Sequence, residues 1–177
     1  MKLLFILSFI LVYLIFGLEI GYTSTSPWYT HITYMFQHGS WWHLVLNSIA
    51  FYSLYLALER IYRPSVIALF AITSAFICSW LCMRYTQPVV GASGMIYAMI
   101  GLYLYLVSIG IYKYKNRRTL IFSLLVISAS LISSFFHRNS AGLLHLLCLC
   151  SGFAFGSSTG KICRIPKRNK NKSPLST

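Results

Sequence analysis

The stretch from Gly91 to Tyr103, GASGMIYAMIGLY, sets a serine among small residues at the start of a long apolar run. The small side chains of Gly91, Ala92 and Gly94 allow a second helix to approach closely and leave the Ser93 hydroxyl unobstructed. They also leave backbone N–H groups free at a helix N-terminus, where these groups can hold an anion. A nucleophilic oxygen needs such surroundings, whereas a serine that only packs between helices, or bonds to its own backbone, does not.

The composition around this stretch indicates a membrane protein. Hydrophobic residues make up 57% of the 177 positions and charged residues 10%, a balance that a water-soluble domain could not hold without large exposed apolar patches. Windows of about 20 residues give six apolar segments that could each span a bilayer: residues 3–22, 43–62, 64–83, 93–112, 119–136 and 140–159. We therefore expect an all-α, polytopic membrane domain of six transmembrane helices over residues 1–160.

The first apolar segment has a second interpretation. Lys2 followed by a leucine-rich run also resembles a secretory signal peptide. The run continues to Tyr22 and no A-x-A cleavage site follows it, which favours a retained helix.

The basic residues predict an orientation. With the N-terminus in the cytoplasm, only Arg84 and Arg138 of the 15 Lys and Arg residues fall outside. This asymmetry follows the positive-inside rule and predicts a plasma (inner) membrane protein with both termini cytoplasmic. The tail of residues 161–177, which begins KICRIPKRNKNK, is then expected to bind anionic lipid headgroups rather than nucleic acid.

This topology gives each polar residue a depth in the membrane. Ser93 begins the fourth helix just below the external surface, and His145 lies roughly one to two turns into the sixth. His43 and Asn47 share one face at the external start of the second helix, because they are four residues apart. Each residue alone could be an ordinary packing or helix-bonding residue, but their common depth favours a functional site.

The scarcity of acids limits the chemistry of such a site. The chain contains no Asp, which excludes an aspartyl protease, and no HExxH, which excludes zinc proteases of that pattern. The cysteines lack metal-ligand spacing, so we expect no metal and no cofactor. Glu59 falls at the cytoplasmic end of the second helix, on the wrong side for Ser93, while depth alone leaves open whether Glu19 approaches it.

A Ser–His dyad without a carboxylate fits these residues best. Ser93 would be the nucleophile, and His145 the general base and then the general acid. His43, Asn47 and the Ser93 backbone N–H would hold the oxyanion. Tyr97, one turn below Ser93, could stack on the His145 ring and fix its rotamer, although it could equally be an ordinary aromatic residue of the bundle.

Glycines on two helices predict how the dyad comes together. Gly152 and Gly156 form a GxxxG on the sixth helix, on roughly the face of His145, and Gly101 supplies a comparable notch on the fourth. Close packing of the two helices would bring Ser93 Oγ to hydrogen-bond distance of His145.

The motifs together resemble a known family. HGSWWHLVLN, GASGMIYAMIGLY and HLLCLCSGFAFG, in this order, resemble the rhomboid intramembrane serine proteases over about residues 28 to 156. The resemblance implies the six-helix rhomboid core, with Ser93 as nucleophile, His145 as base, and His43 and Asn47 at the oxyanion site. His38 matches a further histidine of the family pattern and would support the active-site loop.

The expected substrate follows from the site and from this resemblance. A catalytic layer near the external surface admits both water and an unwound segment, so we expect cleavage of another membrane protein's transmembrane helix near its extracytoplasmic end. The alternatives are a non-catalytic rhomboid-like protein that binds client transmembrane helices and a small transporter. The first would be expected to lack Ser93 or His145, and the second to carry charged residues in mid-membrane.

Overall fold

The computed structural model describes residues 1–16, 20–82, 84–111, 117–136 and 141–159. Helices make up nearly all of the regular structure in these ranges, with one isolated bridge between Tyr22 and Val89. The helices are α1 (Lys2–Ile15), α2 (Thr30–Thr33), α3 (Trp41–Leu58), α4 (Pro64–Leu81), α5 (Ser93–Ser108), α6 (Arg117–Phe136) and α7 (Gly142–Thr159).

Each apolar segment of the sequence overlaps one of the six longer helices, but the predicted end of the first was wrong. That segment was expected to remain helical to Tyr22, whereas α1 ends at Ile15. Tyr22 instead exchanges backbone hydrogen bonds with Val89, at 3.2 and 2.9 Å, and its side chain is fully buried. The apolar residues at the end of this segment therefore belong to a buried loop, which hydropathy alone does not distinguish from a helix.

The helices differ in their capacity to cross a bilayer. Among the described residues, α4 and α7 are long and apolar enough to be candidate spans. Their 18 residues correspond to roughly 27 Å at about 1.5 Å per residue, close to the ~30 Å of a hydrocarbon core. α1, α5 and the part of α6 from Leu124 to Phe136 are apolar but shorter.

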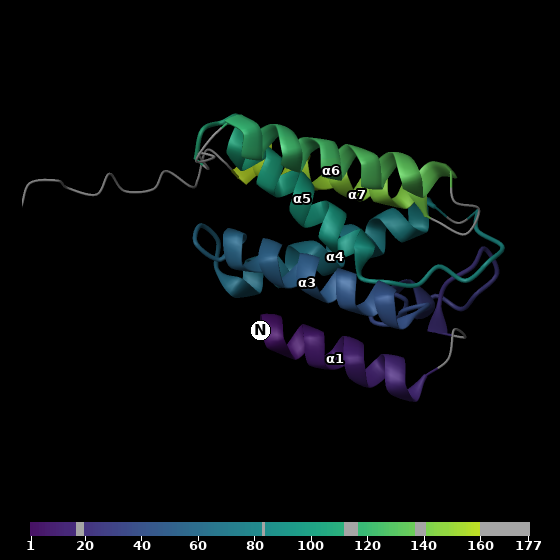
Figure 1. The fold of residues 1–177 in the computed structure, drawn as a ribbon. Coiled ribbons are helices and arrows are strands. Elements are labelled where there is room, and N and C mark those ends of the chain that lie inside the picture. The colour runs from purple at the N-terminus through teal and green to yellow at the C-terminus, as the bar shows by residue number, and fades with distance from the viewer. Residues whose placement is uncertain (17–19, 83, 112–116, 137–140, 160–177) are drawn as a thin grey trace, which may run out of the picture.

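One end of the helical bundle is defined by two contacts between distant residues. Lys2 at the start of α1 pairs with Glu59 just after α3, at 2.6 Å, and Tyr62 hydrogen-bonds to Thr159 at the end of α7, at 3.3 Å. The start of α1 and the end of α7 therefore lie at the same end of the bundle (Figure 1). The first residues of α3, α5 and α7 lie at the opposite end, where the predicted polar layer falls.

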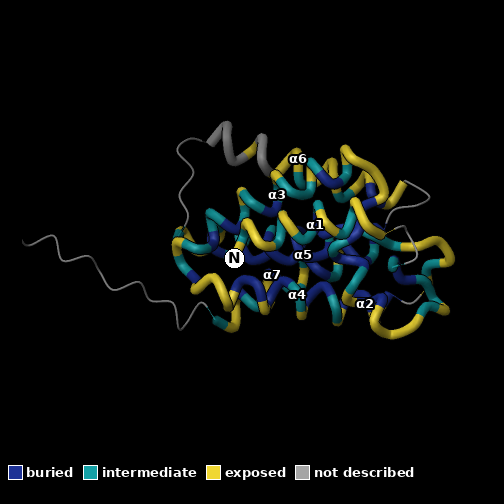
Figure 2. Tube along the Cα trace, turned by 90° about the horizontal axis from the view of Figure 1, so that it is seen from below, coloured by how far each residue is buried: buried dark blue, intermediate teal, exposed yellow. Residues whose placement is uncertain are grey.

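Helix α5 occupies the middle of the bundle. Its Met95, Ala98 and Met99 are fully buried, whereas Leu7 and Leu11 of α1 are 60% and 58% exposed. Figure 2 shows this distribution, with buried residues along the centre and exposed ones on the outer helices. The outer helices thus present leucines to their surroundings, as lipid-facing helices do.

Glycines allow α5 and α7 to pack backbone to backbone. A Cβ atom on Gly152 would collide with the Ala98 carbonyl oxygen and lie 2.7 Å from Leu102 N, and one on Gly101 would collide with the Leu149 carbonyl oxygen. A Cβ on Gly156 would lie 2.6 Å from the Tyr105 ring. The helix contact expected from the glycine spacing is therefore present, and it fixes α7 against the helix that carries Ser93.

Candidate active site

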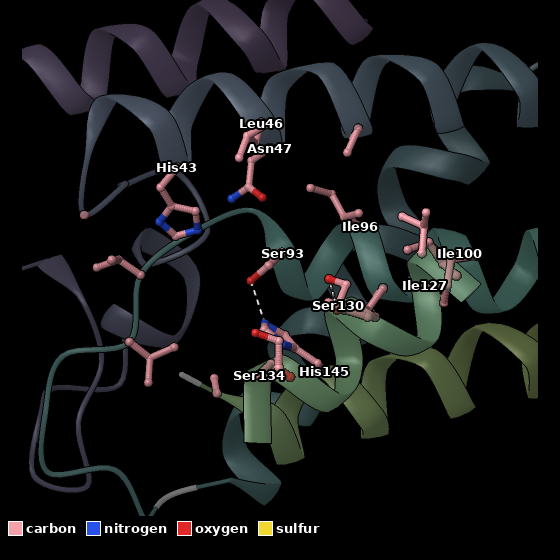
Figure 3. A pocket seen from close by; sticks show the side chains of 18 of the residues that line it. His43, Leu46, Asn47, Ser93, Ile96, Ile100, Ile127, Ser130, Ser134 and His145 are labelled. Carbon is pink, nitrogen blue, oxygen red and sulfur yellow. Dashed lines mark hydrogen bonds between the residues drawn. The ribbon is translucent and has the colours of Figure 1, made fainter. Parts of the chain in front are cut away.

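Ser93 and His145 form a hydrogen-bonded pair between α5 and α7. Ser93 is the first residue of α5, and His145 lies in the first turn of α7, where its backbone N–H donates to the Ala141 carbonyl. The distance from Ser93 Oγ to His145 Nε2 is 2.8 Å (Figure 3). His145 is 8% exposed, so the imidazole is largely shielded from bulk solvent, and a polar contact there is worth more than in water.

The imidazole of His145 is held by an aromatic ring. Tyr97 stacks on it with ring centroids 4.4 Å apart and an interplanar angle of 19°. Among the described residues no group hydrogen-bonds to His145 Nδ1. Glu59 pairs with Lys2 at the other end of the bundle, and Glu19 lies outside the described residues, so the described part of the site has no orienting carboxylate.

His43 and Asn47 face Ser93 from α3 (Figure 3). Ser40 caps this helix by accepting a hydrogen bond from the His43 backbone N–H at 3.2 Å, as serine commonly does at a helix start. His43 and Asn47 follow on one face, because four residues make about one turn. The Asn47 Nδ2 atom is buried and has no hydrogen-bond acceptor among the described residues, so this donor is available to a ligand.

Gly91 makes room for these two side chains. Its φ of 122° belongs to a region that other residues rarely adopt. A Cβ atom at this position would lie 2.7 Å from His43 Cε1 and 3.3 Å from Asn47 Nδ2. The Gly91 backbone N–H is not free, as the sequence had suggested for this stretch, because it donates to the Tyr34 carbonyl at 2.8 Å.

A cavity of about 930 Å³ connects these groups. His43 and Asn47 line it from α3, Ser93 and Tyr97 from α5, and His145 from α7. The rest of the lining is mostly apolar, with a row of serines on α6; it comprises residues 39, 46, 50, 87–90, 96, 100, 126, 127, 130, 133, 134 and 141. Such a pocket can hold an extended peptide segment with its carbonyl near Ser93.

Two predicted supporting residues lie behind the site. Gly94 faces away from the cavity, because a Cβ there would lie 3.0 Å from Tyr34 Oη and 3.3 Å from the Ala75 Cβ; it is a packing residue between helices. His38 is buried at 1% exposure, and its ring packs edge-on against His43 at 5.1 Å and against Phe9 at 5.4 Å. Burial and the neighbouring His43 lower the pKa of His38 to about 4.

Helix α6 also contributes side chains to the cavity, which the sequence analysis did not predict. Ser130, Ser133 and Ser134 line the cavity, and Ser130 hydrogen-bonds to the phenol of Tyr97 at 2.8 Å. The signal that could have found them is their spacing, since positions i, i+3 and i+4 share one helix face. A serine-rich face on an apolar helix indicates a polar partner or a cavity.

Comparison with known proteins identifies the family. A family model described as the Rhomboid domain matches residues 25–162. The chain belongs to the rhomboid family. It is also 30% identical over 146 residues to a Bacillus subtilis (strain 168) protein named "Putative rhomboid protease YdcA", an alignment that covers 77% of this chain and 69% of the relative.

Membership of this family accounts for the exposed apolar helix faces. Rhomboid proteins are membrane proteins, and the leucines exposed on α1 are consistent with a lipid environment. In the described residues, no group of three or more His, Cys, Asp or Glu side chains could hold a metal ion.

Proposed function

We propose that this rhomboid protein is an intramembrane serine endopeptidase that uses Ser93 and His145 as a catalytic dyad. The observation that carries the proposal is the 2.8 Å contact between Ser93 Oγ and His145 Nε2 at the wall of a cavity large enough for an extended peptide. A serine and a histidine that merely stabilised the fold would not need to open onto such a cavity.

The chemistry is acyl transfer. Ser93 Oγ attacks the peptide carbonyl carbon while its proton passes to His145 Nε2. The C–N bond then breaks and the amine leaves with that proton, which leaves an acyl group on Ser93. A water molecule attacks this ester, gives its proton to Nε2, and releases the acid; the proton returns to Ser93 Oγ.

The developing oxyanion would be stabilised from the α3 side of the cavity. The unpaired Asn47 Nδ2 and the His43 ring are donors near Ser93, and the Ser93 backbone N–H lies at the start of α5. Loss of one such donor typically lowers the rate about 10²- to 10³-fold.

The proposed substrate is a transmembrane helix of another membrane protein. The proposal includes six membrane spans within residues 1–160 and both termini in the cytoplasm, with the basic tail of residues 161–177 on anionic headgroups. Lys2 and Thr159 would then be cytoplasmic and the dyad would lie near the external surface. The family resemblance favours small residues at the cleaved bond and helix-weakening residues below it.

The test is cleavage of single-span model substrates in liposomes. The purified protein is reconstituted with a panel of single-span fusions that carry small residues near the extracytoplasmic end, and products are mapped by mass spectrometry. We expect one cut near that end. The Ser93→Ala variant should give no product, whereas Ser108→Ala, which removes an exposed serine hydroxyl at the other end of the same helix, should cleave as the wild type does.

The same assay separates proteolysis from client binding. A folded wild type that co-purifies with the fusions but never cuts them, whatever the residues near the outer end, would contradict the proposal and favour a non-catalytic binding protein. Cleavage that persists in Ser93→Ala would refute the assigned nucleophile.

A further inference from the structure

For the proposed dyad to work, the His145 imidazole must be held in a fixed orientation toward Ser93. A catalytic histidine is usually held in place by a third group that accepts a hydrogen bond from its other ring nitrogen. In the described part of this chain nothing bonds to His145 Nδ1, while Nε2 meets Ser93. Among the described residues it is packing that holds the plane of the imidazole, and Tyr97 is the ring stacked on it.

Tyr97 is itself held at its far end by α6. The side chain is 5% exposed, and its hydroxyl hydrogen-bonds to Ser130 Oγ at 2.8 Å. A tyrosine ring has two torsions, so a bond at the phenol oxygen fixes the end of the ring that its Cα–Cβ bond does not. Ser93 and Tyr97 are one turn apart on α5, which places the nucleophile and the stacked ring on one face.

We propose that Ser130 is a positioning residue that anchors Tyr97 from α6 and, through the stacked ring, holds the His145 imidazole in line with Ser93. This inference rests on the proposed serine protease function. It gives α6 a part in catalysis: α5 supplies the nucleophile and the stacked ring, α7 supplies the base, and α6 supplies the hydroxyl that fixes the ring.

Ser134 and Ser128 of α6 do not share this role. The Ser134 hydroxyl donates to the Leu131 carbonyl of its own helix at 2.7 Å, as serines in helices commonly do. Ser128 is exposed and does not line the cavity. It therefore serves as a matched control on the same helix.

The test is the rate at which a small fluorophosphonate labels Ser93, resolved into a limiting rate constant and an apparent affinity. Ser130→Ala should lower the limiting rate constant about three- to tenfold, the range expected for the loss of one neutral hydrogen bond, with little change in apparent affinity. Ser130→Thr, which keeps the hydroxyl, should label close to the wild-type rate, and Ser128→Ala should be indistinguishable from wild type.

A double-mutant cycle distinguishes anchoring from a general effect on the fold. Tyr97→Phe keeps the stacked ring and removes the phenol oxygen, so it should slow labelling as much as Ser130→Ala. The double variant should then be no slower than either single variant, because both remove the same bond.

Two results would overturn the inference. A wild-type labelling rate in Ser130→Ala would show that the hydroxyl does not position the dyad. Multiplicative losses in the double variant, or a loss that Ser130→Thr does not restore, would show that the two side chains act separately. If the folded wild type does not label at all, the proposed function itself fails, and the inference fails with it.

Discussion

Gly91 shows how a single residue shapes the site. Its positive φ turns the chain into α5, and the space that a side chain would fill is occupied by the His43 ring, 2.7 Å from the position of a Cβ. Asn47 Nδ2 lies 3.3 Å from the same position. Gly91 is therefore required for two reasons: its backbone has a positive φ, and the His43 and Asn47 side chains occupy the space that a larger residue would need.

Replacement of Gly91 by alanine should impair activity more than stability. A φ of 122° lies beyond the left-handed helical region and costs an L-residue about 1–3 kcal/mol, and the new methyl group must displace His43 and Asn47 from Ser93. We expect fluorophosphonate labelling to fall at least about tenfold, as for a misplaced catalytic group. The labelling rate and the thermal unfolding temperature are measured for Gly91→Ala and for the wild type.

Gly110→Ala is the matched control for that experiment. Gly110 also has a positive φ, 75°, but a Cβ there would meet nothing within 4 Å. It should lose about 1–2 kcal/mol of stability, the cost of a left-handed backbone for an L-residue, and keep its labelling rate. Equal loss of labelling in both variants would show that backbone strain, rather than crowding of His43 and Asn47, accounts for the effect.

His38 should make the fold sensitive to acid. Its pKa is lowered to about 4 in the folded protein against about 6.5 in an unfolded chain, so between these values the unfolded state binds more protons. Stability should therefore fall as the pH drops from 6.5 to 4, by up to about 3 kcal/mol from this residue. In His38→Phe, which keeps a planar ring between Phe9 and His43, the Tm in detergent should fall less over this range. An identical pH dependence in both proteins would contradict the assignment.

At the scale of helices, the contact between α5 and α7 determines whether the dyad can form. At Gly152 and Gly101 the backbone of one helix occupies the space that a Cβ on the other would need. The spacing of these glycines predicted this contact, since they share a helix face with His145 and Ser93. Backbone atoms cannot rotate away as side chains can, so a methyl group at either position must separate the helices.

Gly152→Ala and Gly156→Ala should therefore differ. The methyl group at Gly152 meets the Ala98 carbonyl and Leu102 N, whereas the nearest atoms at Gly156 belong to the Tyr105 side chain, namely its ring, which can turn, and its Cβ at 2.9 Å. We expect Gly152→Ala to cost about 1–3 kcal/mol through overpacking and to slow labelling, and Gly156→Ala to have a clearly smaller effect on both. Equal effects in thermal unfolding and labelling would show that helix separation is not what limits the dyad.

Other features of the elements could not be read from the sequence. The apolar run through Tyr22 was expected to continue the first helix, but it forms a loop paired with Val89, because apolar residues bury equally well in a loop. The link from Ser130 to Tyr97 depends on how α6 is placed against α5, and no local pattern specifies that placement. The convergence of Ser93, His145, His43 and Asn47 at one end of the bundle could be predicted because each begins a helix or lies within its first turns; their catalytic roles stay a prediction.

For the whole molecule, the two ends of the described bundle carry different groups. Lys2 pairs with Glu59 and Tyr62 with Thr159 at one end, and Ser93 and His145 lie at the other. Under the proposed topology, 13 of the 15 Lys and Arg residues fall on the side that holds Lys2. Under the proposed orientation the dyad lies near the external surface, where water and an unwound substrate segment can both reach it.

The most direct test of this account is labelling of the folded protein by a fluorophosphonate in detergent or liposomes, with Ser93→Ala, His145→Ala and Ser108→Ala beside the wild type. We expect the wild type and Ser108→Ala to be labelled at Ser93, and Ser93→Ala and His145→Ala to remain unlabelled. A folded wild type that remains unlabelled, or a Ser93→Ala variant that still reacts, would contradict the assignment of Ser93 as a nucleophile activated by His145.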